Sequence, residues 1–259
     1  MSTGLPKRVA VVTGGSAGIG QACAQRLAQD GIDVVIADLR PAEQTLRLIA
    51  EAGVRARAVA CDVTQAEQVE QLAAEVEADF GRCDILVNNA GRYSMLPFEQ
   101  ITLETWRSYM ALNLDAVFLL CKAFLPGMKR RGWGRIINMA SNSALLGAPR
   151  MAHYIASKGG VIGLTRALAA EFGESGITVN ALAPGPTLTE TVVESFYASV
   201  GSRDEAAFKS FLNLLSQNQA IKRTGTPGDV VGALAFVASD AAAFMTGQTL
   251  VVDGGWAHT

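Results

Sequence analysis

The sequence predicts an α/β protein in which a doubly wound, seven-stranded parallel sheet carries helices on both faces. Short β-branched, apolar runs alternate with helical patterns of about a dozen residues, an order typical of right-handed βαβ units. No linker, repeat or low-complexity segment interrupts this alternation. The chain has 259 residues, enough for one large core. Residues 1–259 are therefore expected to form a single domain.

Each predicted strand is a short apolar run rich in β-forming residues. The strands are expected, in chain order, at residues 9–12, 33–38, 55–61, 84–87, 135–139, 177–181 and 249–252. The helical patterns between them cover residues 19–30, 41–53, 65–80, 102–128 and 153–172. The fourth helix has a clear start, because Thr102 is a favourable N-cap and Glu104 adds a negative charge to the first turn.

The regular alternation stops between Pro184 and Thr226, where the chain has helical patches but no strand. An excursion of this length between two strands of a compact domain is usually functional. We expect residues 186–218 to form a lid over a substrate.

Three glycines lie between the first strand and the first helix: Gly14, Gly18 and Gly20. Such a turn needs unusual dihedrals, close backbone approach to a pyrophosphate and close packing of helix on strand. The free N–H groups of the helix N-terminus then face the phosphates. This context predicts a Rossmann-type dinucleotide site, and a glycine-rich turn without a ligand is the alternative.

Asp38 ends the second strand, eighteen residues after Gly20. A carboxylate here accepts hydrogen bonds from an adenosine ribose and repels a 2′-phosphate, which favours NAD over NADP. Ala17 and Leu39 add no positive charge, whereas Arg40 is a counter-argument. A turn residue at the strand end is the structural alternative for Asp38.

Tyr154 and Lys158 are four residues apart and share one face of the predicted helix. A nearby ammonium favours the ionised phenol and lowers the tyrosine pKa from about 10. Such a phenol can take a proton from an alcohol or give one to a carbonyl. The spacing alone also fits two surface residues, so its meaning depends on the cofactor site around it.

Composition argues against several other classes of protein. The 22 basic and 24 acidic residues are nearly balanced, which does not suit a nucleic-acid or membrane binder. There is no signal-peptide pattern at the start and no unbroken apolar run of transmembrane length. The four cysteines have no CxxC pairing, which suits buried free thiols in a reducing compartment. A soluble, cytoplasmic protein without a metal site is expected.

Together these motifs resemble the short-chain dehydrogenase/reductase family in its compact single-domain form. The matching motifs extend along the whole chain, and their order and spacing make a chance match very improbable. They are Thr13-Gly14-x-x-x-Gly18-x-Gly20, Asp62-Val63, Asn88-Asn89-Ala90-Gly91, Asn113, Ser141, Tyr154-x-x-x-Lys158, Pro184-Gly185 with Thr189, and Gly247-Gln248 with Asp253-Gly254-Gly255.

The resemblance implies a catalytic set of Asn113, Ser141, Tyr154 and Lys158. Tyr154 would be the acid/base, Lys158 would bind the nicotinamide ribose and lower the tyrosine pKa, and Ser141 would hydrogen-bond the substrate oxygen. Asn113 would hold a break in the long helix and a water that links Lys158 to solvent; a capping or buried amide is its alternative. Ser143 is a rival for the role of Ser141, because strand alternation could turn either inward.

The residues implied for the cofactor NAD lie mostly at the ends of the expected strands. Asp62 and Val63 would flank the adenine, and Asn88 to Gly91 would support the central sheet. The full set is Gly14, Ser16, Gly18, Ile19, Gly20, Asp38, Asp62, Val63, Asn89, Ala90, Gly91, Tyr154, Lys158, Pro184, Gly185, Thr187 and Thr189.

Three segments should border the substrate: residues 92–98, 142–151 and 186–218. Their side chains are largely apolar, which favours a hydrophobic or aromatic secondary alcohol or ketone over a sugar. The alternative is that these side chains only pack the lid onto the domain. The expected pocket residues are Tyr93, Ser143, Leu145, Met151 and Phe196. His153, beside Tyr154, is expected to be structural or on the surface.

Within the family, residues 80–87 and 128–138 look like NAD-dependent dehydrogenases of aryl secondary alcohols such as 1-phenylethanol. Asn142 and residues 158–163 look equally like pyridoxal 4-dehydrogenase. The leading hypothesis is an NAD-dependent oxidoreductase of a hydrophobic secondary alcohol or ketone. The alternatives are an NADPH-dependent 3-oxoacyl carrier-protein reductase and a non-catalytic NAD-binding sensor. Helices 102–128 and 153–172 are apolar around much of their circumference, and the family implies that they pair into a homotetramer.

Overall fold

The computed structural model describes residues 7–257. Its sheet has seven strands in the order β3-β2-β1-β4-β5-β6-β7, and every neighbouring pair is parallel. The strands are β1 (Val9–Thr13), β2 (Asp33–Asp38), β3 (Ala56–Ala60), β4 (Ile85–Asn88), β5 (Gly134–Met139), β6 (Ile177–Pro184) and β7 (Thr249–Val252). The expected single-domain, doubly wound sheet is confirmed. β6 runs further than expected because Pro184 still pairs with Val252 of β7.

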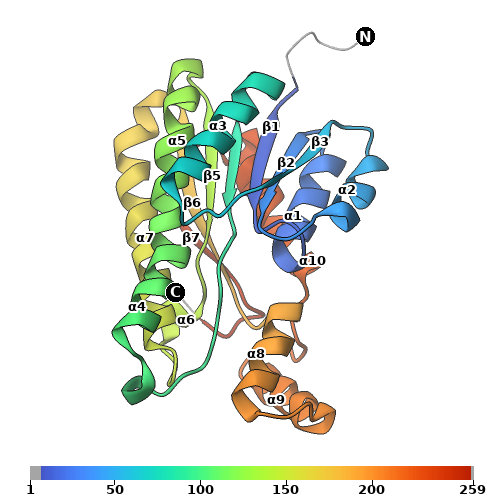
Figure 1. The fold of residues 1–259 in the computed structure, drawn as a ribbon, viewed down its shortest axis with the longest axis vertical. Coiled ribbons are helices and arrows are strands. Elements are labelled where there is room, and N and C mark those ends of the chain that lie inside the picture. Colours follow the sequence, from blue (N-terminus) through green and yellow to red (C-terminus); the bar gives the residue numbers. More distant parts are fainter. Residues whose placement is uncertain (1–6, 258–259) are drawn as a thin grey trace.

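Helices cover both faces of the sheet (Figure 1). One face packs on α3 (Ala66–Phe80), α5 (Ala116–Arg131) and α7 (Ala152–Phe172), and the other on α1 (Gly18–Gln29), α2 (Glu43–Ala50) and α10 (Pro227–Ala238). Because side chains alternate along a strand, Val9 and Val11 of β1 enter the first core and Ala10 and Val12 the second. Because all neighbouring strands are parallel, the glycine turn after β1 and the C-terminal ends of the other strands lie at the same edge of the sheet.

Helix α10 was not among the expected helices. Its start is a capping box, in which the Asp229 carboxylate accepts from the Thr226 N–H at 2.7 Å, and Pro227 occupies the first turn. Val230, Leu234 and Val237 then bury its apolar face against the sheet.

The expected helix 102–128 is interrupted. It begins as α4 (Leu103–Met110), capped by Thr102, whose Oγ1 accepts from the Thr105 N–H at 3.0 Å. A π-helical turn, η2 (Ala111–Asp115), follows, and the helix continues as α5. The combined helix is long and apolar enough to cross a membrane by composition alone. Leu120, Phe124 and Met128 of this helix are buried in the sheet core, and 39% of its most apolar stretch is buried in the described structure.

The segment between β6 and α10 forms two helices, α8 (Glu190–Val200) and α9 (Glu205–Gln217), which lie beyond the lower end of the sheet (Figure 1). Each has a side-chain cap: Thr189 accepts from the Val192 N–H and Asp204 from the Ala207 N–H. Four aromatic rings join the two helices, namely Phe196, Tyr197, Phe208 and Phe211. The expected helical patches without a strand are therefore confirmed.

Candidate active site

A cavity of about 930 Å³ opens where the strands end, and residues of α8 and α9 contribute to its wall. This is the edge at which doubly wound sheets bind ligands. Most of the expected site residues line it. They are Gly14, Gly18, Ile19, Asp38, Asp62, Val63, Asn89, Ala90, Gly91, Tyr93, Ser141, Ser143, Met151, Tyr154, Lys158, Pro184, Gly185, Thr187 and Thr189.

The glycine turn is shaped by its lack of side chains. Gly14 and Gly18 have φ of +64° and +58°, the left-handed region that disfavours other residues. At Gly20 an added Cβ would lie 2.1 Å from the Gly14 carbonyl oxygen. Gly20 is thus needed for helix-to-turn packing and does not line the cavity. Helix α1 begins at Ala17 without a side-chain cap or first-turn acid, so its N-terminal N–H groups remain available to an anion.

Ser16 is also absent from the cavity wall, because it is bonded to Asp38. The Asp38 Oδ2 accepts from the Ser16 N–H at 3.0 Å and from its hydroxyl at 2.5 Å. The Arg40 N–H donates to Oδ1 at 2.9 Å, and the Arg40 guanidinium lies 4.0 Å from the same oxygen. The Asp38 carboxylate and the Arg40 guanidinium therefore both lie at the end of the cavity beside β2.

The asparagines after β4 tie neighbouring strands together, as expected. Asn88 donates to the Asn138 side chain of β5 at 2.7 Å. The Asn89 amide donates to the carbonyls of Thr13 and Gly14 at 2.9 and 3.1 Å, which holds the glycine turn against β4.

Tyr154 and Lys158 lie on the first turns of α7 and both line the cavity. The Lys158 ammonium nitrogen is 5.9 Å from the Tyr154 ring centre and donates to the Met139 carbonyl at 2.7 Å. Ser141 follows β5, and its hydroxyl is close enough to the Tyr154 phenol to lower the pKa of that phenol. Ser143 instead donates its N–H to the Ser141 hydroxyl oxygen at 3.2 Å. Of the two serines, Ser141 is therefore the one that acts on the phenol.

The expected lowering of the Tyr154 pKa by Lys158 is wrong for this structure. Burial raises the pKa of Tyr154 to about 12, and the hydrogen bond from Ser141 offsets only part of that rise. Burial also lowers the pKa of Lys158 to about 8. Desolvation thus dominates both groups, because the ammonium is bonded to a carbonyl and not to the phenol oxygen.

Asn113 occupies the π-helical turn, so the expected break in the long helix is confirmed. Its Oδ1 accepts from the Arg92 N–H at 2.9 Å, and its amide nitrogen donates to the Arg92 carbonyl and the Ser157 hydroxyl, each at 3.1 Å. The side chain is fully buried and does not line the cavity. Both polar atoms of the Asn113 amide are hydrogen-bonded within the protein, and the expected water relay to Lys158 stays a prediction.

The three expected segments all contribute to the wall, with two corrections among the named residues. Leu145 is 36% exposed and lies outside the wall, where its neighbour Leu146 takes its place. Phe196 is buried in the aromatic cluster, stacked 4.9 Å from Phe211, and it is Phe211 that reaches the cavity. A helix turns about 100° per residue. The apolar composition of a helix therefore does not tell which of its apolar side chains faces the cavity.

Sequence reasoning missed Trp256, which lines the cavity from the C-terminal tail. The Asp253 carboxylate fixes it by accepting from the Trp256 N–H at 3.1 Å and from the Asn142 amide at 3.1 Å. The sequence pattern that could have indicated this is Asp253-Gly254-Gly255-Trp256, in which an acid precedes two glycines and a tryptophan.

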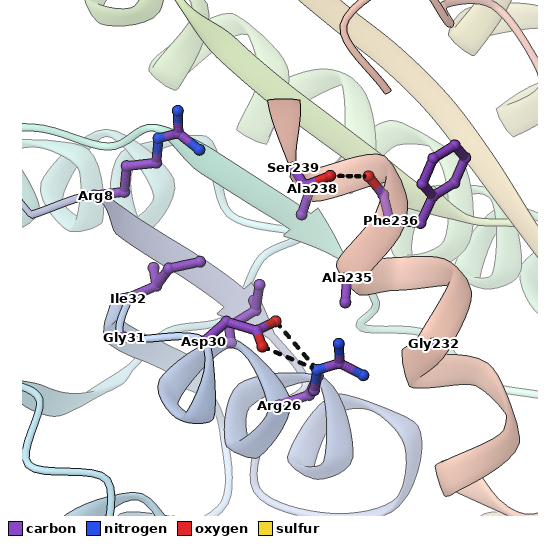
Figure 2. A pocket seen from close by; sticks show the side chains of 11 residues that line it. Arg8, Arg26, Asp30, Gly31, Ile32, Gly232, Ala235, Phe236, Ala238 and Ser239 are labelled. Carbon is purple, nitrogen blue, oxygen red and sulfur yellow. Dashed lines mark hydrogen bonds and ion pairs between the residues drawn. The ribbon is translucent and has the colours of Figure 1, made fainter. Parts of the chain in front are cut away.

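A second cavity, of about 590 Å³, lies at the opposite edge of the sheet between the ends of α1 and α10 (Figure 2). An ion pair between Arg26 and Asp30 and the apolar side chains of Ile32 and Phe236 form much of its wall. None of the expected catalytic or cofactor residues reaches it. The chemistry is therefore concentrated at the first cavity.

Comparison with known proteins agrees with this geometry. A sequence model of the family described as enoyl-(acyl carrier protein) reductase matches residues 14–257. D-threitol dehydrogenase of Mycolicibacterium smegmatis is 40% identical over 97% of this chain and 94% of its own. The 3-oxoacyl-[acyl-carrier-protein] reductase of Synechocystis is 39% identical over 98% of each chain.

Solved structures give the same result. Levodione reductase superposes with a TM-score of 0.90 at 31% identity, covering 96% of this chain and 97% of that one. A variant of actinorhodin polyketide ketoreductase with NADPH gives 0.90 at 35% identity and 98% coverage of both chains. The chain belongs to the short-chain dehydrogenase/reductase family. It is an oxidoreductase for alcohol or ketone substrates that uses a nicotinamide cofactor.

Proposed function

We propose that the protein is an NAD-dependent oxidoreductase for a hydrophobic, aryl or alicyclic, secondary alcohol or ketone. The proposal rests on one observation: Ser141, Tyr154 and Lys158 line the same cavity as a group of apolar side chains. Phe211, Leu214 and Leu215 of α9 supply that apolar side, together with Trp256. A pocket of this kind selects hydrophobic ligands and orients them with a few polar groups.

The uncapped N-terminus of α1 fits a pyrophosphate, and Asp38 at the end of β2 fits an adenosine ribose. Asp38 also supports NAD, because a carboxylate at this place repels a 2′-phosphate. Arg40 favours the rival cofactor NADP, but its guanidinium is shared with Asp38 and Glu190, each 4.0 Å away. The remaining cofactor residues proposed from the motifs are those on the cavity wall.

When bound, the nicotinamide supplies or accepts the hydride. In the reducing direction the neutral Tyr154 phenol gives its proton to the ketone oxygen. Ser141 holds the same oxygen by a hydrogen bond as negative charge develops on it. Lys158, which lines the same cavity, would hold the nicotinamide ribose. Oxidation of the alcohol runs through the reverse proton transfer, from the hydroxyl to the tyrosine phenolate.

Catalysis is favoured over an NAD sensor, because a sensor does not need a serine, a tyrosine and a buried lysine on one cavity wall. A 3-oxoacyl carrier-protein reductase remains the enzymatic rival, and the Synechocystis relative carries that name. We further propose that residues 186–218 act as the lid of the substrate cavity. We also propose a cytoplasmic homotetramer, in which the apolar side chains left exposed on α5, such as Phe118, are covered by a second copy.

The test is steady-state turnover of 1-phenylethanol and acetophenone with NAD(H) and with NADP(H). We expect turnover with NAD(H) to exceed that with NADP(H) at least tenfold, because Asp38 disfavours the extra phosphate. Tyr154→Phe should lower kcat by about 10³-fold while NADH affinity, read by fluorescence, stays within twofold.

The matched control is Tyr197→Phe, which removes a phenol outside the cavity wall and should leave turnover unchanged. Unchanged turnover in Tyr154→Phe would refute the mechanism. A preference for NADPH and 3-oxoacyl thioesters would favour the rival reductase.

A further inference from the structure

A buried polar cluster lies beside the catalytic tyrosine and has no place in the mechanism above. It consists of His153, the residue before Tyr154, Ser94 of the loop after β4, and Tyr109 of α4. The Tyr109 phenol donates to the Ser94 hydroxyl oxygen at 2.6 Å, and that oxygen is 3.2 Å from His153 Nε2. The Tyr109 and His153 rings meet edge to face at 4.2 Å. Three separate elements are therefore joined at one serine.

His153 is fully buried, and its other ring nitrogen, Nδ1, has no hydrogen-bond partner among residues 7–257. A buried polar atom without a partner costs roughly 1–3 kcal/mol, so a leucine would be the better choice for packing alone. Burial, followed by the positive charge of Arg92, lowers the pKa of His153, which favours the neutral ring. Because Tyr109 donates to Ser94, the Ser94 hydrogen is available to Nε2 of that neutral ring. A histidine at this position therefore gives the Ser94 hydroxyl a hydrogen-bond acceptor.

The loop that Ser94 belongs to, residues 92–96, forms part of the cavity wall. Tyr93 and Met95, on either side of Ser94, both line the cavity. The Tyr93 ring packs edge to face on Tyr154, with the ring centres 5.5 Å apart. The position of Ser94 therefore sets where two wall residues lie against the catalytic phenol.

The main chain of the same loop is hydrogen-bonded at each end, to the Asn113 side chain and to the Arg150 carbonyl. Arg92 exchanges two hydrogen bonds with Asn113, and the Leu96 N–H donates to the Arg150 carbonyl at 2.7 Å. Between these two points, the Ser94 side chain is bonded to α4 and α7. Ser195 of α8 also donates to the Tyr93 carbonyl at 3.3 Å, which links the loop to the lid.

We infer that Tyr109, Ser94 and His153 form a positioning unit that fixes Tyr93 and Met95 against Tyr154 and thereby sets how tightly the substrate is held. The unit touches neither the substrate nor the cofactor itself. The inference rests on the proposed function for its kinetic consequence, while its structural consequence stands independently.

The kinetic test compares Ser94→Ala and Tyr109→Phe with wild type, using 1-phenylethanol and NAD. We expect KM for the alcohol to rise about tenfold in each, because a wall displaced by a fraction of an ångström weakens substrate positioning. The dissociation constant for NADH should stay within twofold, since the cofactor residues lie elsewhere. His153→Leu should behave as Ser94→Ala does. His153→Gln places an amide near Nε2 and should recover most of the affinity.

The structural test is amide hydrogen exchange in residues 92–98. The Arg92 and Leu96 amides are hydrogen-bonded, and their exchange should speed up at least tenfold in Ser94→Ala and Tyr109→Phe. Amides of β1 and β4 should keep their wild-type rates. The matched control, Ser210→Ala, removes a hydroxyl that bonds only to its own helix and should change nothing.

The two arms separate the possible failures. If wild type does not turn over 1-phenylethanol, the proposed substrate class is wrong. The amide hydrogen exchange of Arg92 and Leu96 then decides this inference by itself. Unchanged exchange in both variants overturns it in every case. Faster exchange with an unchanged KM overturns the positioning role and leaves a purely structural one.

Discussion

The Lys158 ammonium is buried and Tyr154 beside it is half-buried, and burial opposes the charged form of each. Two opposite charges in contact would stabilise one another, but here the ammonium bonds the Met139 carbonyl instead. Tyr154 is therefore ready to donate a proton, as ketone reduction requires. Alcohol oxidation has to start from the minor, ionised form of the same residue.

The pH dependence should differ between the two directions. With its pKa raised to about 12, Tyr154 stays protonated from pH 6 to 8, so kcat/KM for ketone reduction should be flat there. The phenolate fraction grows tenfold per pH unit, so kcat/KM for alcohol oxidation should rise by about that factor per unit. Above pH 8 the loss of the Lys158 proton, whose pKa is lowered to about 8, should bend that rise. Initial rates in both directions over pH 6–9.5 check this; a flat oxidation profile would contradict it.

At the scale of elements, the sequence predicted the strands well, because each is a short apolar run between helices. The proposed catalytic serine is harder to predict, since the chain leaves the strand at Met139 and alternation no longer tells Ser141 from Ser143. Phe196 was misplaced because α8 and α9 turn their aromatic rings toward each other, which only tertiary packing decides. Trp256 was missed because the Asp253 carboxylate, and no periodic pattern, brings the tail to the cavity.

The glycine turn makes an element-scale prediction, because Gly20 and Gly14 belong to one packing contact. Gly20→Ala places a methyl group 2.1 Å from the Gly14 carbonyl oxygen, so α1 must shift away from the turn. We expect a loss of about 1–3 kcal/mol in the free energy of unfolding, measured by urea denaturation, together with weaker NADH binding.

Gly173→Ala is the control for that substitution. Gly173 has a right-handed helical conformation and nothing within 4 Å of an added Cβ. Its free energy of unfolding should stay equal or rise by about 0.4–1 kcal/mol. Equal losses in the two variants would show that the contact at Gly20 is not the cause.

For the whole molecule, the distribution of exposed apolar side chains bears on assembly. Phe118 of α5 is 50% exposed and Leu103 at the start of α4 is 61% exposed, on the outer side of a helix whose inner side is core. Covering a large apolar side chain contributes about 1.5–3 kcal/mol. A second copy of the same chain would cover this face symmetrically, which is how most soluble oligomers assemble.

We expect the wild-type protein to sediment as a tetramer at micromolar concentration. Phe118→Asp should shift it to smaller species, because an aspartate buried in that interface lacks a partner charge. Val200→Asp places the same charge on a similarly exposed apolar site, 47% accessible, on helix α8. That variant should remain tetrameric, since α8 is not part of the proposed interface. Sedimentation velocity on all three distinguishes the outcomes: a monomeric wild type contradicts the tetramer, and a tetrameric Phe118→Asp variant moves the interface away from α5.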